Sequence, residues 1–136
     1  MTELLLKLFR VNGLLLLVGD RLSKSLGLTG ARWQVMGALA DDPLTVAQIA
    51  RNMGLQRQSV QRLVNVLSQQ ALLILSDNPH HSRARLVRLT ATGRNLYERI
   101  SQIQAHWVND ISEGLEVTDL RLAFDQLREI EERLTK

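Results

Sequence analysis

The stretch TVAQIARNMGLQRQSVQRLVNVLSQQ, Thr45 to Gln70, decides the fold. It opens with a threonine and has a glutamine three residues later, the capping-box pattern that starts a helix. Gly54 stands where a helix end or tight turn is expected. From Val60 onward, apolar residues recur at spacings of three and four, and Gln, Arg and Asn fall on the opposite side. Two helices joined by a short glycine-containing turn are typical of a helix-turn-helix.

The residues that follow predict a β-hairpin. LLILS (72–76) and ARLVRLT (84–90) have the composition of strands, and they flank DNPHHSR, in which Pro79 marks a turn. Thr90 is then expected to cap another helix. A helix-turn-helix followed by a hairpin is a winged helix. The predicted fold class is therefore mainly α with a small β-hairpin wing (α+β), a winged helix-turn-helix.

Long helices are predicted at both ends of the chain. The first runs from about Glu3 to Leu26 and is apolar on all sides over Leu14 to Val18. The last follows a break near EGLEVT, and its apolar residues alternate at spacings of three and four, as in a coiled-coil seam. A domain of this size covers one side of such a helix. We therefore expect both terminal helices to contact a second subunit.

Composition excludes several classes of function. The chain has 136 residues and no cysteine, which excludes disulfides, thiolate catalysis and thiol-based peroxide sensing. The apolar run Leu14–Val18 is too short to span a membrane, and no signal-peptide cleavage site is evident, so we expect a cytoplasmic protein without membrane contact. No nucleophile elbow or glycine-rich phosphate loop occurs. We expect neither an enzyme nor a cofactor.

Positive charge is concentrated in the middle of the chain. Residues 51–99, here called the basic island, contain eight basic and two acidic residues, a net charge of +6. The remaining nine basic and twelve acidic residues give −3. All eight basic residues of the island are arginines, which suit bidentate recognition of phosphate or guanine. The alternative is an arginine-rich face that is merely solvated.

The sequence resembles the MarR family of bacterial transcription regulators over nearly its whole length. The resemblance rests on LTGARWQVMGALADDPLTVAQIARNMGLQRQSVQRLVNVLSQQALL (28–73) and RARLVRLTATGRNL (83–96). Its most specific part is V-x-L-T-x-x-G, Val87 to Gly93. It implies a single MarR-like domain over residues 1–136, with the winged helix at about 28–90 and dimerisation helices at about 1–27 and 91–136.

The family's properties give functional expectations. The resemblance implies a homodimer that binds double-stranded DNA, with the recognition helix in the major groove and the wing toward the minor groove. Two symmetric recognition helices predict a near-palindromic operator. The resemblance further implies a repressor that a small, often aromatic, ligand releases from DNA. The alternative function is a winged-helix protein-interaction module without DNA binding.

The expected DNA-binding residues lie on the second helix of the motif and in the wing. Glutamine pairs with adenine and arginine with guanine in the major groove, and short polar side chains contact phosphates. The candidates are Arg57, Gln58, Ser59, Gln61, Arg62 and Asn65 on the helix, and Arg83 and Arg85 in the wing. The alternative is that the helical residues merely form the solvent-exposed polar face of a surface helix.

The wing departs from the family at His81. The family usually carries Asp-x-Arg-Ala here, and alignment puts His81 in place of the aspartate, so the ion pair with Arg83 is missing or replaced. If His80 and His81 lie near phosphates, acidic pH should strengthen DNA binding. No metal site is expected, since adjacent residues of an extended segment point to opposite sides and His106 lies on a distant helix.

A ligand pocket is the least defined part of the prediction. Trp33 and Trp107 are the candidates for lining a cavity that takes a small aromatic ligand. The alternative is that both tryptophans simply fill the core.

Overall fold

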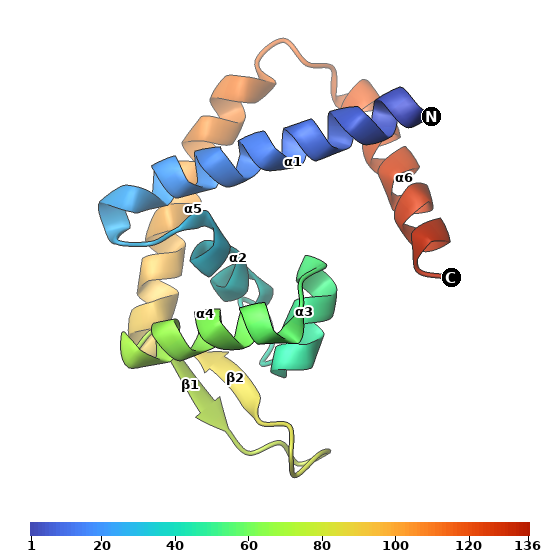
Figure 1. The fold of residues 1–136 in the computed structure, drawn as a ribbon. Helices are drawn as coiled ribbons and strands as arrows, with labels where there is room; N and C mark the ends of the chain where they lie inside the picture. The colour runs from blue at the N-terminus through green and yellow to red at the C-terminus, as the bar shows by residue number, and fades with distance from the viewer. The chain divides into compact units, whose positions relative to one another are not determined.

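The computed structural model describes all residues, 1–136, and contains six α-helices, a short 3-10 helix and one two-stranded antiparallel hairpin (Figure 1). The elements are α1 (Thr2–Ser23), the 3-10 helix η1 (Lys24–Leu26), α2 (Gly30–Ala38), α3 (Val46–Met53), α4 (Arg57–Gln69), β1 (Leu73–Ser76), β2 (Leu86–Leu89), α5 (Ala91–Ser112) and α6 (Val117–Leu134). This order confirms the predicted winged helix-turn-helix. None of the helices combines the length and the apolar content needed to cross a membrane.

The chain forms two compact units. The first comprises residues 1–104 and the second residues 105–136, and their boundary falls inside α5. The first unit holds the winged helix, with the hairpin extending beyond the helices (Figure 1). The second unit holds the end of α5 and the whole of α6.

Local sequence signals set the ends of α3. The Thr45 hydroxyl accepts a hydrogen bond from the Gln48 backbone N–H (3.2 Å), and the Gln48 side chain accepts one from the Thr45 N–H (2.9 Å). Gly54 ends the helix in the left-handed conformation (φ 64°), and the Leu55 N–H donates to the Ala50 carbonyl (2.9 Å). The capping box and the glycine turn are therefore as predicted. Together they fix where α4 starts.

The apolar stripe of α4 anchors that helix in the core of the first unit. Val60, Val64 and Leu67 are completely buried, and Leu63 packs against them half-buried. Fully burying side chains of this size contributes about 1.5–3 kcal/mol each. The same core includes Met36 of α2, Ile49 of α3, Val87 of β2 and Ile100 of α5. Burial of one side leaves the opposite, polar side of α4 facing solvent.

The wing is joined to the rest of the unit at its base. β1 and β2 pair in register from Leu73↔Leu89 to Ser76↔Leu86. Leu44, just before α3, adds a bridge that the sequence did not predict: the Val87 N–H donates to its carbonyl (2.7 Å), and its N–H donates to the Val87 carbonyl (3.2 Å). The start of α3 is thereby held beside the hairpin.

The Leu-Thr-x-x-Gly pattern has a structural reason. The Thr90 hydroxyl accepts from the Gly93 N–H (3.0 Å), which caps α5 as predicted, and donates to the Ala71 carbonyl (2.7 Å). The Thr90 N–H donates to the Leu72 carbonyl (3.1 Å). Gly93 packs so closely on this carbonyl that any Cβ would collide with it. Threonine and glycine thus join the end of α4 and the wing to α5.

The terminal helices expose apolar residues that nothing in the chain covers. In α1, Leu14, Leu15 and Leu17 are exposed, Leu17 to 66%. In the second unit, α6 has no buried residue, and Phe124 is 62% exposed. Of the all-round apolar segment Leu14–Val18, four residues are exposed and Val18 is half-buried, so the single chain covers less of this segment than the expected one side.

Candidate nucleic-acid interface

The polar face of α4 carries the predicted helical residues. Five of the six are exposed, namely Arg57, Gln58, Gln61, Arg62 and Asn65, and Ser59 is half-buried. They project away from the buried stripe because Val60, Val64 and Leu67 fill the core on the opposite side. The face is thus a rigid, solvent-accessible row of amide and guanidinium groups.

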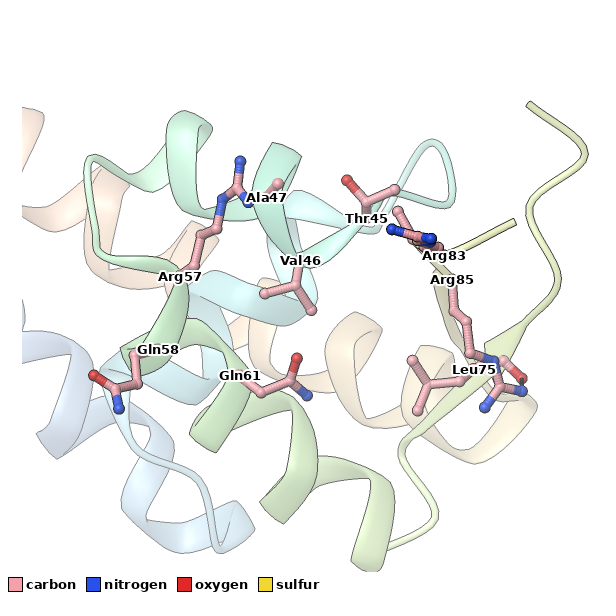
Figure 2. A pocket seen from close by; sticks show the side chains of 10 residues that line it. Thr45, Val46, Ala47, Arg57, Gln58, Gln61, Leu75, Arg83 and Arg85 are labelled. Atoms are coloured by element: carbon pink, nitrogen blue, oxygen red, sulfur yellow. Dashed lines mark hydrogen bonds between the residues drawn. The ribbon is translucent and has the colours of Figure 1, made fainter. Parts of the chain in front are cut away.

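A pocket of about 540 Å³ lies between this face and the wing (Figure 2). It brings together five of the eight predicted DNA-binding residues from segments that are far apart in sequence. These are Arg57, Gln58, Gln61, Arg83 and Arg85, while Ser59, Arg62 and Asn65 do not line it. The structure thereby places the two wing arginines beside the start of α4.

Five further residues line the pocket that the sequence did not single out. Three come from the first turn of α3 and two from the strands and loop of the wing: Thr45, Val46, Ala47, Leu75 and Ala84. The capping box located the start of α3 in the sequence. Its position beside α4 and the wing depends on the Leu44–Val87 bridge, which has no sequence signature.

The arginines of this interface have no acidic partner. The chain's two ion pairs, Arg128–Asp125 (3.3 Å) and Arg133–Glu129 (2.8 Å), both lie in α6. The Arg85 side chain has a long contact to the Leu75 carbonyl (3.5 Å). The side chains of Arg57, Arg62 and Arg83 make no hydrogen bond within the chain, so their charge and donors are free for an anionic partner.

Two arginines of the basic island have structural partners. The Arg88 Nε donates to the Ser76 hydroxyl across the hairpin (3.1 Å). The Arg94 guanidinium donates to the Ala40 carbonyl just beyond the end of α2 (3.2 Å). Both side chains remain exposed, but these hydrogen bonds hold their guanidinium groups against the protein surface. The free charge of the island is therefore carried mainly by α4 and the wing.

In the loop at the tip of the wing, backbone N–H groups donate to the side chains of Asn78 and His81 and to one backbone carbonyl. The Asn78 side chain accepts from the His80 N–H (3.0 Å), and the His81 N–H donates to the Asn78 carbonyl (3.2 Å). The His81 Nδ1 accepts from the N–H groups of Arg83 (3.3 Å) and Ala84 (3.2 Å). His81 thus braces the loop as an acceptor and leaves the Arg83 guanidinium unpaired.

On α4, one side-chain pair is already formed. Gln61 Nε2 donates to Asn65 Oδ1 over 2.9 Å, a contact between residues one turn apart. Gln58, three residues before Gln61, has no such partner. The carboxamides of Gln58 and Gln61, both exposed on the polar face of α4, therefore differ in how firmly they are held.

The candidate ligand residues lie in different units. Trp33, on α2, is half-buried and packs against the core of the first unit. Trp107 is half-buried in the part of α5 that belongs to the second unit. A pocket lined by both stays a prediction. Nowhere in the chain do three His, Asp or Glu side chains gather as ligands for a metal ion.

Comparison with known proteins gives a consistent set of relatives. A family model described as "MarR family" matches residues 26–84, which span the helix-turn-helix and the start of the wing. The uncharacterised protein Rv2011c of Mycobacterium tuberculosis is 34% identical over 126 residues, covering 93% of this chain and 88% of that protein. The transcriptional activatory protein BadR of Rhodopseudomonas palustris is 26% identical, covering 83% and 73%.

Solved structures share the fold. A MarR/EmrR family transcriptional regulator from Acinetobacter sp. ADP1 matches with a TM-score of 0.89 at 18% identity, covering 98% of this chain and 96% of that one. Reduced AbfR bound to DNA matches with 0.74 at 19% identity (99% and 94%). CouR from Rhodococcus jostii RHA1, bound to p-coumaroyl-CoA, matches with 0.82 at 23% identity (90% and 87%).

Proposed function

Because the chain belongs to the MarR family of transcription regulators, we propose that it acts in the cytoplasm as a homodimer that binds a specific, near-palindromic DNA duplex. Each subunit inserts α4 into a major groove and directs its wing toward the adjacent minor groove. The observation that carries this proposal is the pocket between α4 and the wing, which gathers three arginines without an acidic partner.

The chemistry of this pocket suits the DNA backbone and groove edges. Arg57 at the start of α4 and the two wing arginines offer planar, permanently charged donors to phosphate oxygens. A narrow minor groove attracts arginine through its enhanced negative potential, which favours Arg83 and Arg85 for the wing contact. Gln58, Gln61 and Arg62 face outward on α4, where base edges of a major groove would lie.

The exposed apolar residues of α1 and α6 support the homodimer. Isolated apolar side chains on a surface are ordinary, but rows of leucine along two helices favour burial against a partner. A second copy of the chain would carry the same faces, as a two-fold symmetric interface requires. In such a dimer two α4 helices bind half-sites about one helical turn apart.

We further propose that binding represses transcription and that a small aromatic ligand, held near Trp33 and Trp107, releases the DNA. CouR, which shares the fold, was crystallised with p-coumaroyl-CoA, a ligand with a phenolic acyl group. BadR, a relative over most of the chain, is instead named as an activatory protein. A reporter assay with and without the regulator therefore decides the direction, and a screen of aromatic acids and their thioesters tests the release.

Selection of bound duplexes from a random pool tests the central proposal. We expect one enriched near-palindrome, and an affinity for it that falls steeply with salt because phosphate contacts release counterions. Combined replacement of Arg57, Arg83 and Arg85 by alanine should weaken DNA binding. The slope of the logarithm of the binding constant against the logarithm of salt concentration should become less steep by roughly 1 for each lost phosphate contact. Arg128→Ala in α6, an exposed arginine that does not line the pocket, is the matched control and should retain both.

Failure to enrich any duplex would contradict the proposal and favour a winged-helix protein-interaction module. If the triple variant bound DNA as tightly as the wild-type protein, DNA binding would stand, but the assignment of the pocket between α4 and the wing to the DNA contact would be wrong. Thermal melting of each variant tests whether a loss of binding comes from a loss of the fold.

A further inference from the structure

The Gln61 carboxamide is held in place by a neighbour on the same helix. Gln61 Nε2 donates to Asn65 Oδ1 at 2.9 Å, and both residues are exposed. This is the one hydrogen bond between two side chains of α4, whereas Gln58, also exposed, has none. Gln61 also lines the pocket, so its side chain stands at the edge of the recognition face beside the wing (Figure 2).

The bond to Asn65 defines what Gln61 has left to offer. A carboxamide has two N–H donors and one acceptor oxygen. With one N–H bound to Asn65, Gln61 keeps one N–H and Oε1, a single donor beside a single acceptor. Adenine presents the complement in the major groove, with N7 as acceptor and the N6 amino group as donor. Guanine presents two acceptors at its N7 and O6, and Oε1 has no partner there.

Resting on the proposed function, we propose that Gln61 reads an adenine in each half-site and that Asn65 is a positioning residue that prepares Gln61 for it. Preorganisation matters because a free glutamine loses rotational freedom when it binds a base, and this loss weakens recognition. In the free protein, the bond to Asn65 has already restricted the Gln61 side chain. Gln58 lacks this restraint and so makes a weaker base-specific contact.

Substitutions separate the recognition of adenine by Gln61 from the positioning of Gln61 by Asn65. Gln61→Ala should abolish the preference for adenine at one position per half-site, a preference of about five- to 150-fold. Gln61→Glu offers acceptors only and should shift the preferred base at that position to cytosine, whose N4 amino group donates. Asn65→Leu keeps the size of the side chain but removes the acceptor, and should lower the adenine preference about two- to tenfold.

Asn65→Asp is the conservative control. Its carboxylate still accepts from Gln61 Nε2, so the ratio of adenine to other bases should be retained. The overall affinity should fall, because the added negative charge lies near DNA phosphates. This separation of selectivity from affinity would not be seen if Asn65 merely supported the helix or touched a phosphate.

The experiment selects duplexes from one random pool with the full-length wild-type protein and each variant, and then measures affinities for the selected site with single-base changes. Failure of the wild-type protein to select any site would contradict the proposed function. If a site is selected but Gln61→Ala leaves every position unchanged, the reading of adenine is wrong and DNA binding stands. An adenine preference that is unchanged in Asn65→Leu, or one that disappears in Asn65→Asp, would overturn the positioning role.

Discussion

At the scale of single residues, Gly93 shows how one missing side chain allows two elements to join. Its Cα lies against the carbonyl group of Leu72, which also accepts the Thr90 N–H. Gly93→Ala forces the segment between α4 and β1 away from α5, because the collision is with the Leu72 backbone, which has little freedom to move. We expect the free energy of unfolding to fall by about 1–3 kcal/mol, measured by urea denaturation at fixed protein concentration.

A second glycine provides the control for this substitution. A Cβ at Gly37, in α2, would meet the Tyr97 ring at 3.6 Å, an ordinary van der Waals distance. Gly37→Ala should therefore be tolerated and should raise stability by about 0.5–1 kcal/mol, because alanine favours the helix. Equal urea midpoints for Gly93→Ala and the wild-type protein would show that the close approach to Leu72 does not constrain the fold.

Residues that carry a chemical signature were predictable from the sequence, and those without one were not. Thr45 and Thr90 were identified as caps because short polar side chains readily accept hydrogen bonds from the first turn of a helix. Gly54 was identified because glycine tolerates positive φ. Ala71 adopts the same left-handed conformation, with φ 58°, yet alanine gives no such signal. One tertiary hydrogen bond involves it, from the Thr90 hydroxyl to its carbonyl.

At the scale of elements, the wing depends on His81 as a hydrogen-bond acceptor. His81→Ala removes the acceptor for the N–H groups of Arg83 and Ala84, at a cost of about 0.5–1.5 kcal/mol for each bond. We expect these two amides to lose protection from hydrogen exchange and DNA affinity to fall. His81→Asn, which keeps an acceptor oxygen at a similar position, should preserve both. If the backbone amides of Arg83 and Ala84 exchanged hydrogen at the same rate in His81→Ala and in the wild-type protein, His81 would not stabilise the loop.

Helices and strands whose apolar residues recur at a regular spacing were predictable from the sequence. Their arrangement relative to one another was predictable only in part. The apolar spacing of α4 identified its buried stripe, and hence the face that carries Arg57, Gln58 and Gln61. The wing arginines were recognised from their charge. The first turn of α3 was missed as part of the pocket, because the Leu44 bridge that places it involves one residue and therefore has no periodicity.

At the scale of the whole molecule, the two terminal helices leave large apolar side chains exposed in the single chain. α1 and α6 were predicted to meet a second subunit because their apolar residues exceed what one small domain covers, and in the single chain those residues are exposed. The sequence could not show how two copies associate, since a two-fold interface depends on shape and not on pattern. The proposed dimer nevertheless has a quantitative consequence for DNA binding.

In a symmetric dimer, each substitution on α4 acts twice on a palindromic site. Arg62 is exposed and has no partner in the chain, and its replacement by alanine should cost about 1–3 kcal/mol per half-site if it reads a base. The loss should therefore be about 2–6 kcal/mol on the full site, and half of that on a duplex with one half-site scrambled. Gel shifts at fixed salt measure both. A nearly equal loss on all sequences would make Arg62 a phosphate contact, and unchanged affinity on both duplexes would remove it from the interface.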